Sequence, residues 1–122
     1  MCAHGCETLA RVRAGSARVR VVSAHNGDAL ADGTTLWLVV ETSRGSFARA
    51  LAQDGVACGF DRPLATLVQF ESLARLVVEG RATPEIRVTF RRTVDGAGGR
   101  EALACSLDDD VPACAAVAPA AE

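Results

Sequence analysis

The sequence contains no lysine and no tyrosine, and it has a single isoleucine and a single tryptophan among its 122 residues. All thirteen basic side chains are therefore arginines, a skew typical of a GC-rich coding sequence, so their number alone indicates no function. The formal net charge of −2 excludes a global attraction to nucleic acid or to an anionic membrane. Only a local basic surface remains for such partners.

The sequence also lacks long apolar runs. Residues 1–15 contain no apolar core of a secretory signal, and no later window approaches the length of a membrane span. These absences predict a cytoplasmic or nuclear protein that is not secreted and has no membrane partner. The five cysteines are an odd number, and in a reducing compartment we expect no disulfide framework.

What is present indicates one domain with a substantial core, because nearly half of the residues are apolar. Apolar and polar residues alternate in several short runs separated by Asn-Gly and Asp-Gly turn pairs, which is typical of antiparallel strands. The clearest predicted strands are 34–41, 85–94 and 100–107, and a hairpin loop is predicted at 95–99. The predicted fold class is α+β, an antiparallel sheet of about five to six strands with one or two helices on one face. The predicted parts are a poorly ordered or short helical N-terminus (1–16), a single α+β domain (17–110) and a disordered Ala/Pro-rich tail (111–122).

Residues 61–80 change hydrophobic period in the middle. Residues 64–70 alternate with a period of two, and from Glu71 onward the apolar residues recur with helical spacing. One interpretation is a buried strand to Phe70 that leads into an amphipathic helix ending at Gly80. The alternative is a single helix from Pro63, capped by Asp61.

No catalytic or metal centre can be assembled from the sequence. Cys2, His4 and Cys6 have poor spacing for a zinc site with Cys105, Cys114 or His25, so we predict no metal. Cys58 fits a buried apolar thiol, and the aspartates at 108–110 fit a solvated charge run. No phosphate-binding loop or nucleophile elbow is present, so the chain is predicted not to be an enzyme and to need no cofactor.

The arginines are the remaining functional signal. If two helices line one surface, a local basic face would contact the phosphates of DNA; its residues are Arg11, Arg13, Arg75 and Arg81. Two strands with outward arginines are candidates for sheet edges that pair with a partner or a second copy; their residues are Arg18, Arg20, Arg87 and Arg91. Against both stands the fact that exposed basic positions in a lysine-free protein are simply arginine.

Residues 61–77 carry a family resemblance. Asp61-Arg62, Leu64-Ala65, Val68, and Ser72 three residues before Arg75 resemble the strand-then-helix segment of one domain of the sliding DNA clamp family. Residues 33–47 are similar to the corresponding strand of a checkpoint-clamp subunit. The resemblance implies helices that face DNA, with Arg75 at a basic inner position, and Arg11 and Arg13 if the N-terminal run is helical. Clamp subunits have two such domains, and this chain has one.

Three functions follow as hypotheses. The first is a non-enzymatic clamp-like domain that binds protein partners or DNA in replication, repair or viral late transcription, as a homo- or hetero-oligomer. The second is a host-interaction protein on a β-rich scaffold that acts through its surface. The third is a carrier of small apolar ligands that resembles sterol-carrier domains, although the helix which that family needs after Gly80 is replaced here by a strand led by Pro84.

Overall fold

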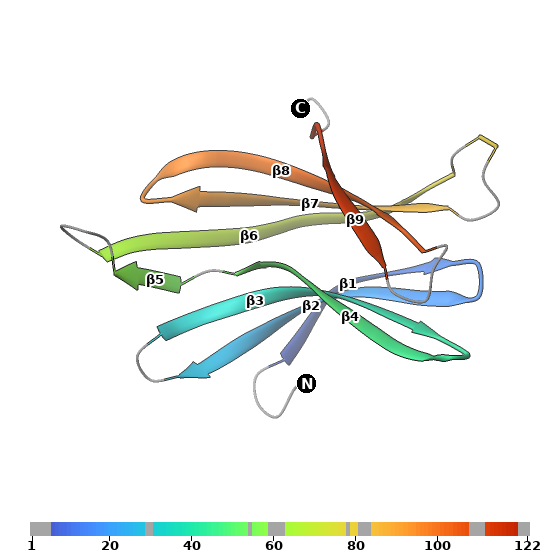
Figure 1. Ribbon diagram of the computed structural model, residues 1–122, viewed down its shortest axis with the longest axis horizontal. Coiled ribbons are helices and arrows are strands. Elements are labelled where there is room, and N and C mark those ends of the chain that lie inside the picture. The colour runs from blue at the N-terminus through green and yellow to red at the C-terminus, as the bar shows by residue number, and fades with distance from the viewer. Residues whose placement is uncertain are drawn as a thin grey trace.

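The computed structural model describes residues 6–28, 31–53, 55–58, 63–77, 79–80, 84–107 and 112–119. Over these residues the regular structure is entirely β (Figure 1). The strands are β1 (Cys6–Ala14), β2 (Ala17–Asp28), β3 (Ala31–Thr42), β4 (Gly45–Gln53), β5 (Gly55–Cys58), β6 (Pro63–Leu76), β7 (Glu85–Val94), β8 (Ala97–Ser106) and β9 (Ala113–Val117).

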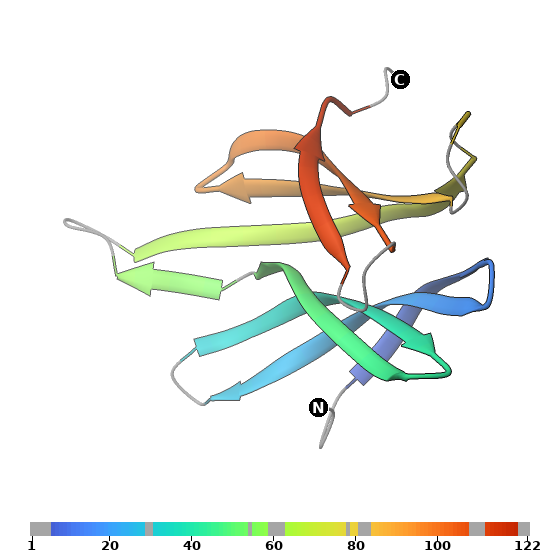
Figure 2. The ribbon, with the colours of Figure 1, turned by 45° about the vertical axis from the view of Figure 1, so that its right-hand side comes forward.

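The strands form two antiparallel sheets that lie one above the other (Figures 1 and 2). One sheet has the order β1-β2-β3-β4 and the other the order β5-β6-β7-β8-β9, so every strand pairs only with its neighbours in the sequence. The chain passes from one sheet to the other between β4 and β5. None of the described segments is a helix that could cross a membrane.

The core lies between the sheets and follows from the period-two alternation of the strands. In β7, Ile86, Val88 and Phe90 are buried while the residues between them are partly exposed. In β3, Leu38 and Val40 face the same core from the opposite sheet. The inner faces of the two sheets therefore build one apolar core between them, as expected for stacked sheets.

The α+β prediction is wrong, because the described residues contain no helix. The segment interpreted either as strand plus helix or as one helix is the single long strand β6. A β-bulge explains the misleading pattern: the pairing with β7 shifts by one residue between Phe70 and Ser72, at Glu71. Phe70 and Leu73 consequently both pack on the core at a spacing of three residues, which imitates a helix.

The two ends of the chain also differ from expectation. Residues 6–14, predicted to be poorly ordered or helical, form β1, and residues 113–117 in the predicted disordered tail form β9. The strands predicted at 34–41 and 85–94 are confirmed within β3 and β7, and the strand predicted at 100–107 corresponds to β8, which ends one residue earlier, at Ser106. The hairpin predicted at 95–99 is confirmed too, with a turn of only two residues, Asp95 and Gly96.

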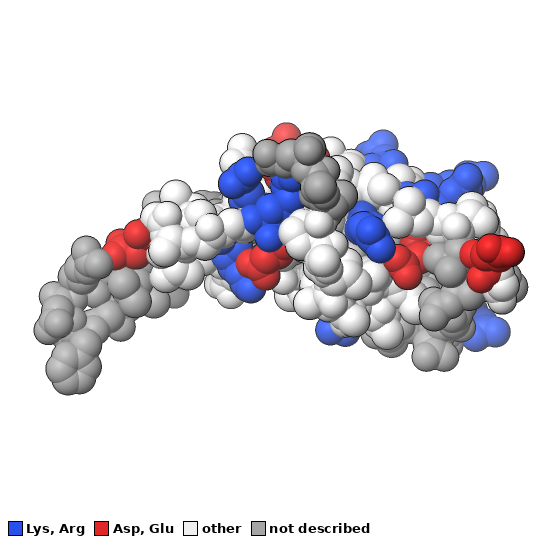
Figure 3. Space-filling model, turned by 90° about the horizontal axis from the view of Figure 1, so that it is seen from above, with Lys and Arg blue, Asp and Glu red and all other residues white. Residues whose placement is uncertain are grey.

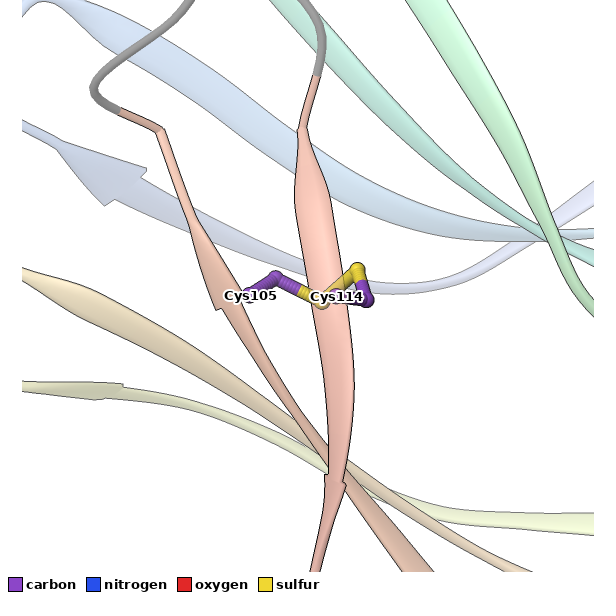
Figure 4. The surroundings of a disulfide bond; sticks show 2 residues. All are labelled: Cys105 and Cys114. Carbon is purple, nitrogen blue, oxygen red and sulfur yellow. A yellow bond between two sulfur atoms is a disulfide. The ribbon is translucent and has the colours of Figure 1, made fainter.

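The expectation of no disulfide is contradicted. Cys105 on β8 and Cys114 on β9 lie directly opposite each other and are disulfide-bonded (Figure 4). Cys105 is fully buried in the apolar core, so the bond links the edge strand β9 covalently to a core residue of the neighbouring strand β8. Cys6 is disulfide-bonded as well. The cytoplasmic or nuclear localisation stays a prediction, and these bonds are of a kind that persists in oxidising compartments.

Candidate functional site

The hairpin of β1 and β2 places four arginines on one face of its sheet. Its turn consists of Gly15 and Ser16, and the φ of 62° at Gly15 fits the first position of a type II′ turn. The register sets two arginine pairs directly opposite each other, and the valines between them face the core. We call this surface the arginine face; its members are Arg11 opposite Arg20 and Arg13 opposite Arg18.

One carboxylate partly neutralises the arginine face. Glu41 on β3 lies 3.3 Å from Nε of Arg20 through its Oε1, and Nη1 of Arg20 also donates to the hydroxyl of Thr8 at 3.3 Å. Within the described part of the chain, the other three guanidinium groups of the face form no ion pair. Four positive charges thus share one negative charge.

The arginine face is hollowed. A concavity of about 600 Å³ is lined by Arg11, Val12, Arg13, Arg18, Val19, Arg20 and Glu41. Three of its four arginines are exposed and Arg20 is half-buried. Like charges directly opposite each other on adjacent strands destabilise a sheet. An anion in this concavity would relieve that repulsion, and planar guanidinium groups bind carboxylate, phosphate and sulfate groups through two parallel hydrogen bonds.

The other sheet contains a matching pair that is neutralised. Arg91 and Arg100 lie directly opposite each other on β7 and β8. Glu71, at the bulge of β6, accepts hydrogen bonds of 2.6 and 3.2 Å from Arg100, and its Oε2 lies 3.6 Å from Nε of Arg91. The hydrogen bond from Arg100 is the largest cause that lowers the pKa of Glu71 below 4.5. In the view onto this sheet, blue arginine atoms accordingly flank red acidic atoms (Figure 3).

The remaining arginines of this sheet also have partners. Arg92 forms two hydrogen bonds of 2.7 Å with Glu101, and Arg87 lies 3.3 Å from Glu85. Arg75 on β6 donates from Nη1 to the backbone carbonyl oxygen of Arg13 at 3.2 Å, across to the first sheet. Among the described arginines on strands, five form no ion pair, and three of these five lie together on β1 and β2; the five are Arg11, Arg13, Arg18, Arg49 and Arg75.

The structure regroups the arginines that the sequence singled out. Arg11 and Arg13, predicted for DNA, join Arg18 and Arg20, predicted for a sheet edge. Arg75 is not on an exposed helix but on a strand, and Arg81 lies outside the described residues.

The edge prediction is wrong for both strands. β2, which carries Arg18 and Arg20, lies between β1 and β3, and β7, which carries Arg87 and Arg91, lies between β6 and β8. The edge next to the arginine face is β1. The sequence held a signal for this that was missed: the letters ARVR occur at 10–13 and again at 17–20 around Gly15 and Ser16, a pattern that a hairpin folds into facing pairs.

The cysteine and histidine candidates for a metal do not converge in the described residues. Cys105 and Cys114 are bonded to each other, and Cys6 is also in a disulfide, so these sulfurs are not thiolate ligands in this state. Cys2 and His4 lie outside the described residues, as do the aspartates at 108–110. Among the described residues, no three His, Cys, Asp or Glu side chains lie together as a metal site would require.

Comparison of the chain with protein-family models, with curated proteins and with solved structures finds no match. The function is therefore inferred from the arrangement of the chain's own side chains.

Proposed function

We propose that the protein is a non-enzymatic binding module that captures a negatively charged protein partner through the arginine face. The observation that carries this proposal is the contrast between the two sheets. Both place arginines directly opposite each other, but the Arg91–Arg100 pair encloses Glu71, whereas Arg11, Arg13 and Arg18 have no described carboxylate partner. The guanidinium groups of the arginine face repel one another in the folded protein, and a bound anion would remove that repulsion.

Of the three hypotheses from the sequence, this proposal retains the second, a β-rich scaffold that acts through its surface. The clamp hypothesis requires helices facing DNA, and the apolar carrier requires a helix over an apolar cavity; the described residues contain no helix. Single-stranded nucleic acid is the less favoured anion, because its binding combines a basic groove with aromatic side chains for base stacking. The residues that line the concavity include no aromatic side chain.

The test is titration of the folded protein with polyglutamate, with duplex DNA as comparator, at increasing salt. We expect polyglutamate binding that weakens with salt and is lost in the double variant Arg11→Gln/Arg13→Gln. The matched control Arg44→Gln/Arg49→Gln removes the same charge from the β3–β4 hairpin, which carries β4, the edge strand opposite β1 in the same sheet. Binding that both doubles weaken equally, or that favours duplex DNA, contradicts the proposal.

A further inference from the structure

The backbone next to the arginine face is an edge that a partner strand can extend. β1 pairs with β2 alone in the described sheet. Ala14 and Ala17 close the two-residue turn, so they form a hydrogen-bonded pair, and hydrogen-bonded and non-hydrogen-bonded pairs alternate from there. The N–H and C=O groups of Arg11 and Arg13 therefore point away from β2, out of the sheet.

The contact with Arg75 supports this orientation. Its guanidinium reaches the carbonyl oxygen of Arg13 at 3.2 Å, which requires that this oxygen points out of the sheet. The other outward groups of this edge, both from Arg11 and the N–H of Arg13, have no backbone partner among the described strands. Three outward backbone groups thus lie beside a row of guanidinium groups, and the fourth, the carbonyl oxygen of Arg13, is held by Arg75, which a partner strand would displace.

We propose that the partner segment is an extended acidic strand that adds to the edge of β1 and places alternate carboxylates against Arg11 and Arg13. Side chains two residues apart on a strand lie on the same face, about 6.6 to 6.8 Å apart. A partner with acidic residues at alternate positions has the same repeat, so its carboxylates meet the arginines while its backbone pairs with β1. This inference rests on the proposed function and names the form of its partner.

Charge argues against a second copy of this chain as the occupant of the edge. Pairing of β1 with β1 of another molecule would bring two arginine faces side by side and would double the number of adjacent positive charges. Charged side chains on an edge strand generally prevent such self-association. A strand that carries carboxylates would instead attract the arginines at each of these contacts. The proposed occupant of the edge is therefore an acidic strand.

The experiment uses three short, labelled peptides with the intact protein. In the first, glutamate alternates with valine and threonine; the second has the same composition with its glutamates contiguous; the third is the first with N-methylated backbone amides. Fluorescence anisotropy measures each affinity. We expect the alternating peptide to bind about tenfold more tightly than its isomer, since it gains roughly 1.4 kcal/mol from matched charges and backbone pairing. N-methylation should abolish this advantage.

Variants locate the site. Arg11→Gln and Arg13→Gln should each weaken the alternating peptide by about fivefold, which corresponds to roughly 1 kcal/mol for an exposed ion pair, and Arg49→Gln should leave it unchanged. Equal affinity for the two isomers, or undiminished binding of the N-methylated peptide, overturns strand addition while leaving the proposed anion-binding function intact. Absence of any arginine-dependent binding of polyglutamate overturns both. Tighter binding of a single-stranded oligonucleotide than of the alternating peptide contradicts the choice of a protein partner.

Discussion

Arg13 on β1 and Arg18 on β2 lie directly opposite each other at the turn end of their hairpin, in a pair whose backbone groups do not bond to each other. Such pairs hold their side chains closest together, with Cα atoms about 4.5 Å apart. The repulsion between the two guanidinium groups is thus built into the register of the hairpin. The arginines that would bind an anion therefore lower the stability of the fold, so replacing one of them should change stability and anion binding in opposite directions.

Replacing Arg13 with glutamate should reveal this separation. Arg13→Glu turns a like-charge pair into an opposite-charge pair, so we expect the free energy of unfolding to rise by about 0.2 to 1 kcal/mol at low salt. Polyglutamate binding should be lost in the same variant. Urea unfolding at low and high salt measures the first effect, and the gain should shrink as salt screens it. Arg49→Glu is the control, and a loss of stability in Arg13→Glu would contradict the repulsion.

Glu71 should make stability depend on acid. Its pKa is lowered in the folded protein, chiefly by the hydrogen bond from Arg100, so its stabilising contribution is complete above its ordinary value of 4.5. That contribution is lost as the pH falls below 4.5 through the lowered folded value. Glu71→Gln should therefore be less stable than the parent near neutral pH and should approach it at low pH. Arg100→Gln should reproduce this convergence, and a pH-independent difference would contradict it.

The Cys105–Cys114 bond should stabilise the sheet that carries β9. The bond closes a short loop between adjacent strands. We expect the double variant Cys105→Ala/Cys114→Ala to lose about 2 to 4 kcal/mol of unfolding free energy in denaturant titrations. Mass measurement with and without reductant checks that the bond forms in the parent. An unchanged midpoint in the double variant would show that the bond adds nothing to the fold.

Two adjacent glycines in β8 should respond oppositely to alanine. Gly98 has φ of 140°, and a Cβ there would meet the carbonyl oxygen of Arg92 on β7. Gly99 has no atom within 4 Å of such a Cβ and no positive φ. Gly98→Ala should therefore cost at least about 2 kcal/mol, and Gly99→Ala should be close to neutral. Thermal unfolding of both variants provides the comparison, which equal costs would contradict.

The sequence predicts individual strands better than it predicts their assembly. The alternation of Ile86, Val88 and Phe90 correctly indicates β7, because a strand with one buried face places every second side chain in the core. The bulge at Glu71 could not be seen in the same way. One extra residue changes the phase of the pattern, and the resulting i, i+3 spacing from Phe70 to Leu73 equals that of a helix.

The arginine face was partly within reach of the sequence. The sequence indicates all four arginines of this face as candidates but assigns two to a helix and two to an edge strand; they are Arg11 and Arg13, and Arg18 and Arg20. The repeated ARVR letters indicate pairing only once residues 6–14 are recognised as a strand. Which carboxylates neutralise which arginines depends on contacts between strands, as with Glu71 and Arg100 across 29 residues of sequence, and no local pattern records these.

The order of strands in the two sheets has a kinetic consequence. Each strand pairs only with its sequence neighbours, so every ladder in the described chain forms by growth of a local hairpin. The long-range step is the docking of one completed sheet on the other, which brings β1 against β6. We therefore expect the contacts between β1 and β6 to form late, when the sheets dock, and the edge beside Arg11 and Arg13 to form earlier, with the β1–β2 hairpin.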